Sequence, residues 1–190
     1  TSGTVPGMAD QGVWDSTVTT ANNTTVSSPI SMAGLRVTNP GGPVTIQATS
    51  PLTLGVSGVD LSSSTRDLSL NGVISLDESA TWNVATNRAV TVANGLSGIG
   101  GLTKSGNGRL DLLGTDSFIA ALSVTAGEVV KTGAGTQSST SVSNNAVLRI
   151  SHSGGFGAGR LSIGAANSST GRVEISGNIS VLTGKTVTIN

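Results

Sequence analysis

Short triplets in which a polar residue separates two apolar residues recur along the chain. They are VTI at 44–46, LTL at 52–54, LSL at 68–70, VTV at 90–92, LDL at 110–112, LRI at 148–150, LSI at 161–163, VEI at 173–175 and VTI at 187–189. Because successive side chains of a β-strand point to opposite faces, each triplet is typical of a very short strand buried on one side. Corners rich in Gly, Asn, Asp and Ser separate the triplets. The pattern therefore predicts an all-β chain that turns often.

Internal similarity indicates that these strands stack. LSLNGVISL at 68–76 and VEISGNISV at 173–181 share four apolar positions, a Gly and an Ile-Ser step. The steps from Leu68 to Ile74, Trp82 and Val90 predict three strands per turn and a coil of about 22 residues, hence roughly eight or nine coils. Stacked coils pair in parallel ladders and bury Val on Val and Leu on Leu. A β-sandwich is the alternative, but the short steps leave too little length for its strands.

We therefore predict a parallel β-helix, or β-solenoid, as one structural unit over residues 41–190. Residues 1–40 are polar and irregular, and we expect them to form an N-terminal cap or the first irregular coils. The chain begins at Thr1, so either a leader has been removed or the chain is part of a longer one, and both readings stay open.

Composition narrows the classes of function. Ten basic and ten acidic residues give zero formal net charge, and only 11% of residues are charged, which argues against a nucleic-acid partner. Cysteine is absent, so we expect neither disulfides nor thiolate metal sites. No apolar run is long enough for a transmembrane segment. No cofactor motif emerges, and no cofactor is expected.

One stretch resembles a known repeat. GLTKSGNGRLDLLGTDSFIAALSVTAGEVV at 101–130 is similar to the autotransporter-associated β-strand repeat, through its GLTK-G-G opening, alternating Leu residues, aromatic Phe118 and the V-x-A-G-x-V ending. The resemblance extends upstream to about residue 50. It departs at IAA, residues 119–121, where the family often has a Gly-Gly turn. It implies a right-handed parallel β-helix at the cell surface or outside the cell, acting as stalk, adhesin or scaffold. It does not imply catalysis.

The same stretch is no phosphate loop. Lys104 follows Thr103 rather than Gly and leads into a predicted turn and strand instead of a helix. GIGGLT at 98–103 likewise lacks the third Gly and the helix of a dinucleotide site. His152, the only histidine, is expected to be a turn residue rather than a catalytic base. We expect Trp82 to pack inward and Trp14 to close the N-terminal cap.

Carboxylates are the strongest catalytic candidates, since paired carboxylates on adjacent coils would support acid/base chemistry on sugars. They are Asp60, Asp67, Asp77, Glu78, Asp111, Asp116, Glu128 and Glu174. Asp111 and Glu174 occupy outward triplet positions and are expected to be solvated, and Asp67 is expected to pair with its neighbour Arg66. A calcium site would lack the GGxGxD signature of β-rolls. We therefore predict a protein that is not an enzyme and assign no metal site.

The predicted function is an extracellular structural or adhesive β-solenoid that assembles head to tail with itself. The chain ends directly after the triplet at 187–189, without a charge cluster or Pro to block an exposed ladder. A heterologous contact between copies at such an edge propagates into a filament. Val187 and Ile189 are the residues assigned to this self-assembly edge. The alternatives are a β-helix that binds or cleaves carbohydrates, with surface glycans as partners, and a passive stalk segment of a larger surface protein.

Overall fold

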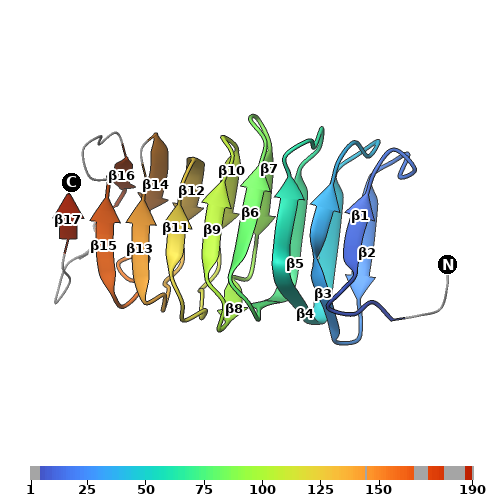
Figure 1. Ribbon diagram of the computed structural model, residues 1–190, viewed down its shortest axis with the longest axis horizontal. Coiled ribbons are helices and arrows are strands. Elements are labelled where there is room, and N and C mark those ends of the chain that lie inside the picture. Colours follow the sequence, from blue (N-terminus) through green and yellow to red (C-terminus); the bar gives the residue numbers. More distant parts are fainter. Residues whose placement is uncertain (1–4, 144, 165–170, 178–186, 190) are drawn as a thin grey trace.

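The computed structural model describes residues 5–143, 145–164, 171–177 and 187–189, and they form one long parallel sheet wound into a solenoid. Its strands are β1 Gln11–Trp14, β2 Asn22–Val26, β3 Ile30–Val37, β4 Val44–Leu61, β5 Leu68–Leu76, β6 Ala80–Val84, β7 Ala89–Val92, β8 Leu96–Gly98, β9 Leu102–Ser105, β10 Arg109–Leu112, β11 Leu122–Val124, β12 Gly127–Lys131, β13 Ser139–Val142, β14 Ala146–Ile150, β15 Arg160–Ile163, β16 Arg172–Ile175 and β17 Val187–Ile189. Figure 1 shows the strands side by side along an extended column with the two chain ends at opposite ends. Over these residues we find no helix, and so none that could cross a bilayer.

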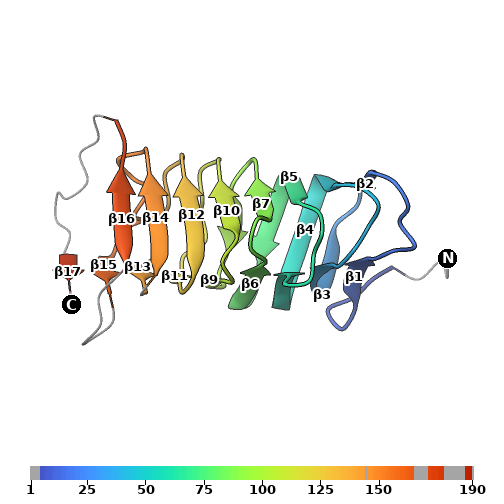
Figure 2. The same ribbon diagram turned by 90° about the horizontal axis from the view of Figure 1, so that it is seen from above.

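Each coil has up to three flat faces. The first face consists of β2, the starts of β4 and β5, and then β7, β10, β12, β14 and β16. The second face consists of the start of β3, the middle of β4, the end of β5 and β8. The third face consists of β1, the ends of β3 and β4, and then β6, β9, β11, β13, β15 and β17. Figure 2 shows the first face along its length.

This architecture confirms the prediction of an all-β parallel solenoid with short strands. The column has about seven turns, slightly fewer than the predicted eight or nine. Coil length varies around the predicted repeat, from 18 residues between Leu122 and Thr140 to 26 between Leu161 and Val187. The shorter coils follow the point where the second face loses its regular strand, after β8.

The core is a set of columns of inward side chains. On the first face Leu68, Val90, Leu110, Val129 and Leu148 lie in successive register and are all fully buried. The column continues to Val173, which explains the similarity between the segments that begin at 68 and 173. Stacking equal positions in this way removes apolar surface from water and satisfies the backbone in the same step. Trp82 on β6 is 0% exposed, so the prediction that it packs inward is confirmed.

The first 40 residues contain part of the ladder. β1 pairs with β3 on the third face, and β2 pairs with β4 on the first. Trp14 ends β1 opposite Val37, packs against the core and donates from its indole nitrogen to the Asn22 side chain at 2.9 Å. Asn22 and Thr24 of β2 lie in register with the buried Val44 and Ile46, so the first coil has polar residues where the next coil has aliphatic ones.

Gly72 shows why glycine lies at a corner. It has φ of +106°, and a Cβ there would collide with the carbonyl oxygen of Ala48 in the preceding coil. Only glycine combines that backbone conformation with that close approach. The corner between the first and second faces of β5 therefore depends on this residue.

Candidate functional site

The most unusual chemistry of this column lies in its interior, towards the C-terminal end. Five polar or charged side chains are almost completely buried over β9 to β13. They are Lys104, Asp116, Lys131, Gln137 and Thr140. The coils before them have aliphatic residues or Trp82 at the matching inward positions.

Lys104 lies on β9, in register between Trp82 and Val124, and points into the column. Its Nζ donates to the carbonyl oxygens of Ser105 at 2.8 Å and Gly106 at 2.7 Å, and to that of Ala126 in the next coil at 3.3 Å. Burial lowers the pKa of this lysine to about 8. The residues after it form a turn and β10, as predicted, and the ammonium group secures that turn from inside.

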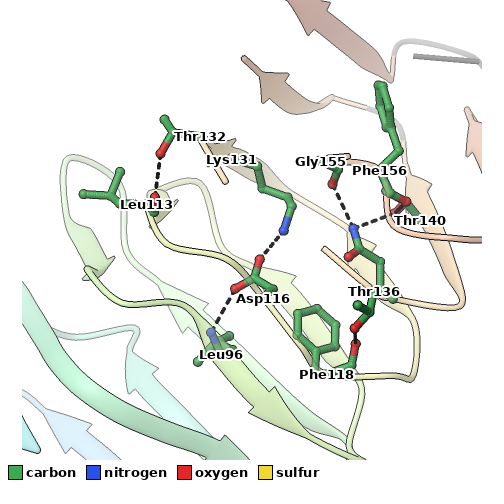
Figure 3. Close-up of polar contacts among 11 residues, drawn as sticks. Leu96, Leu113, Asp116, Phe118, Lys131, Thr132, Thr136, Thr140, Gly155 and Phe156 are labelled. Carbon is green, nitrogen blue, oxygen red and sulfur yellow. Dashed lines mark hydrogen bonds and ion pairs between the residues drawn. The ribbon is translucent and has the colours of Figure 1, made fainter. Parts of the chain in front are cut away.

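Lys131 and Asp116 form a buried ion pair. Lys131 ends β12, in register between Leu112 and Ile150, and both side chains of the pair are 0% exposed. Asp116 Oδ2 contacts Lys131 Nζ, while Asp116 Oδ1 accepts the backbone N–H of Leu96 at 2.9 Å. Figure 3 shows the carboxylate between these two donors. Asp116 comes from one coil and Lys131 from the next, so the pair connects consecutive coils.

A second polar group lies beside the pair. Gln137 Nε2 donates to the carbonyl oxygen of Gly155 at 3.0 Å and to Thr140 Oγ1 at 3.3 Å, and Thr140 Oγ1 donates to the carbonyl oxygen of Phe156 at 3.1 Å (Figure 3). Gln137 Oε1 has no hydrogen-bond partner among the described residues. These bonds replace strand pairing where the second face is irregular.

The outer charges are arranged as ion pairs on the first face. Arg149 contacts both Glu128 and Glu174 on the neighbouring strands, and Arg109 contacts Asp111 at 2.6 Å. The prediction that Asp111 is solvated is wrong, because this pairing leaves its side chain only 12% exposed.

Asp67 also differs from expectation. It pairs with Arg88 at 3.4 Å and accepts the N–H of Ala89, whereas Arg66 donates to the carbonyl oxygen of Gly41. The predicted Arg66–Asp67 pair is therefore wrong, because Asp67 meets Arg88 of the adjacent coil instead. Asp60 pairs in the same way with Arg36 on the preceding coil, at 3.6 Å.

The remaining catalytic candidates do not converge. Asp77 and Glu78 are exposed at a corner, and Arg149 separates Glu128 from Glu174. Over the described ranges, no three His, Asp or Glu side chains lie close enough together to hold a metal ion. His152 lies in a turn, as predicted, and its Nδ1 accepts the Gly154 N–H at 3.1 Å.

The third face has a different surface from the first. Thr81, Thr103, Ser123 and Ser141 lie in successive register on β6, β9, β11 and β13. Ser141 Oγ donates to Ser123 Oγ at 3.2 Å. The result is a row of short hydroxyl side chains along the column.

Four strands lie at the two ends of the described column. At one end β1 pairs with β3 and β2 with β4, and at the other β16 pairs with β14 and β17 with β15. In the described residues these four strands have a partner on one side each. Val187 and Ile189 lie in β17, opposite Leu161 and Ile163. The structure thus places both residues of the predicted assembly edge in a terminal strand of the third face.

Sequence reasoning missed the buried lysines, although a signal was present. LTK at 102–104 and VVK at 129–131 have the form of the strand triplets, with Lys in the second inward position. A charged residue in an inward position indicates either that this position is open to solvent or that the charge has a buried partner.

Comparisons of the chain with known protein families, with curated proteins and with solved structures found no match.

Proposed function

We propose that this chain is a non-enzymatic structural or adhesive β-solenoid of the extracellular or cell-surface type, related to the autotransporter-associated repeat. The observation that carries the proposal is the continuous parallel ladder, in which each coil buries aliphatic columns and pairs with the next. A column of this kind extends in one dimension and supplies long, regular side faces. These are the properties that a stalk or a filament subunit needs.

Head-to-tail assembly is the specific form that we propose. A parallel edge at one end of a column is complementary to the parallel edge at the other, because continuing the ladder repeats the pairing already used inside. The contact is heterologous, so each added copy leaves another free edge and the assembly grows as a fibre. The edge strands β1 and β17 both belong to the third face, which allows that face to continue from one copy into the next.

Negative-stain electron microscopy, together with the mass in solution, tests this assembly. The purified chain should form long uniform fibres, and Val187→Lys with Ile189→Lys should shorten or abolish them, because a lysine on an edge strand opposes edge pairing. Val13→Lys, on β1 at the opposite end, should have the same effect.

Thr103→Lys is the matched control. Like Val13→Lys, it adds one lysine to the outward side of the third face, but on β9, which has a partner strand on each side. Fibres that persist in both edge variants would refute assembly through these strands. Monodisperse short rods from the unmodified chain would favour the passive stalk instead.

The hydroxyl row on the third face favours glycan binding as a second candidate function. Neutral sugars are recognised largely through hydrogen bonds to hydroxyl groups, and this row offers them at the regular spacing of β-strands, about 4.8 Å. Binding to a polysaccharide panel, with and without calcium, tests the candidate. Ser123→Arg should abolish a signal from this row, while a signal unchanged in that variant would place binding elsewhere.

A further inference from the structure

The buried contact between Lys131 and Asp116 has a chemical consequence beyond an ion pair. Both side chains are 0% exposed, and Asp116 is the only hydrogen-bond acceptor found for Lys131 Nζ among the described residues. Lys131 lies between two aliphatic side chains of its column, those of Leu112 and Ile150. An amine nitrogen is therefore held against a carboxyl group in a site that excludes water.

We propose that Lys131 and Asp116 join through an intramolecular isopeptide bond between consecutive coils. Two ions are costly to bury, and transfer of one proton from the ammonium to the carboxylate yields a neutral amine and carboxylic acid. A desolvated neutral lysine is a nucleophile. Its target is prepared on the other side, because the Leu96 N–H donates to Asp116 Oδ1 at 2.9 Å and stabilises negative charge that develops on that oxygen.

The reaction is a condensation that needs no outside reagent. Lys131 Nζ attacks Asp116 Cγ and forms a C–N bond, and the bond from Cγ to Oδ2 breaks. Oδ2 leaves as water, with one proton from the carboxylic acid and one from the amine. No group is oxidised or reduced, and the neutral amide that remains removes the cost of two buried charges.

The position of this bond fits a mechanical need of the column. Regular strands on the second face end at β8 among the described residues, and Asp116 lies just beyond, opposite Leu96. The backbone there forms single hydrogen bonds rather than a regular strand. The Ser117 N–H donates to the carbonyl oxygen of Leu96 at 2.6 Å, the Ile119 N–H to that of Gly98 at 3.2 Å and the Asp116 N–H to that of Ala134 at 2.8 Å. An amide from Asp116 to Lys131 would connect this segment to β12 of the next coil, where the second face has no regular strand among the described residues.

Mass spectrometry of the purified full chain tests the bond directly. The intact mass in denaturant should be lower than the sequence mass by one water molecule. A glutamate-specific protease then cuts after Glu78, Glu128 and Glu174, the three glutamates of the sequence. Fragments 79–128 and 129–174 should remain joined, because Asp116 lies in the first and Lys131 in the second.

Two variants give the control. Lys131→Met should restore the full calculated mass and separate the two fragments, whereas Lys104→Met, which removes the other buried lysine, should leave them joined. The digest is read under denaturing conditions, so a bond that formed in the folded chain is detected whatever the stability of the variant. A wild-type chain of full mass, or a chain short of one water whose fragments separate, would overturn the proposal.

Discussion

Lys104 should make this protein more stable as the solution becomes alkaline, in a defined window. Burial lowers the pKa of Lys104 in the folded chain to about 8, from 10.5. Between these values the unfolded chain carries a proton that the folded chain has released, so the free energy of unfolding rises with pH. Below about pH 8 Lys104 is protonated in both states, so the free energy of unfolding no longer changes with pH through this group. The folded state then bears the full cost of the buried charge.

The interval between the two pKa values sets the size of the effect. At about 1.4 kcal/mol per pH unit the gain is at most about 3 kcal/mol, and screening by solvent near the corner reduces it to about 1–2 kcal/mol. Cys and Tyr, whose ordinary pKa values fall in this window, are absent from the sequence.

Urea unfolding at a series of pH values from 7 to 11 measures this slope, with Lys104→Met as the matched variant. Methionine keeps the length and apolar body of the side chain and removes the titrating group. The variant should lose the rise in stability between pH 8 and 10.5, because the titrating group is gone. It should also be less stable at every pH, because three carbonyl oxygens lose their donor. A wild-type slope that is flat or negative, or one that survives in Lys104→Met, would refute the reasoning.

Three further substitutions test the column itself, each by urea unfolding. Trp82→Ala should cost about 3–5 kcal/mol, because it empties a fully buried position, while Thr81→Ala on the exposed side of the same strand should cost less than about 0.5 kcal/mol. Gly72→Ala should cost about 2 kcal/mol or more, since it meets a carbonyl oxygen at a positive φ, and Gly7→Ala in open surroundings should be nearly neutral. Arg149→Gln should cost no more than about 1 kcal/mol, and less in high salt, because its ion pairs are partly exposed at 46%. These assignments would be contradicted if Trp82→Ala and Thr81→Ala, or Gly72→Ala and Gly7→Ala, lowered the free energy of unfolding equally. An effect of Arg149→Gln that salt leaves unchanged would also contradict them.

The fold could be predicted because its determinants are local and repeated. A triplet such as that at 68–70 specifies a strand, its inward face and its length in three residues, and the stacking of Leu68 on Val90 follows once the repeat is known. The predicted coil count was slightly high, because it divides the whole chain by one repeat length, whereas the first-face ladder begins only at Asn22 and coil length varies.

Partners on the surface and in the core could not be predicted in the same way. Asp67 meets Arg88 rather than Arg66 because residues about one coil apart lie side by side, and that distance varies from coil to coil. The buried ion pair could not be predicted for the same reason. Asp116 and Lys131 become neighbours only once the chain between them has folded into its coil. A one-dimensional pattern specifies which side of a strand is buried, but not which distant residue meets it there.

The direction of the ladder bonds connects the polar core to the proposed structural role. Hydrogen bonds between parallel strands of adjacent coils run along the column, so a pull along its axis loads these bonds and the stacked side chains, while the backbone within each coil is hardly stretched. The coil that contains Asp116 has no regular strand on its second face among the described residues, and single backbone hydrogen bonds join that part to its neighbours. It is also the coil where a carboxylate and a lysine of the next coil meet in a dry core. A covalent bond at this coil would carry load that hydrogen bonds alone carry in the coils on either side, so those coils would open first under a pull along the axis.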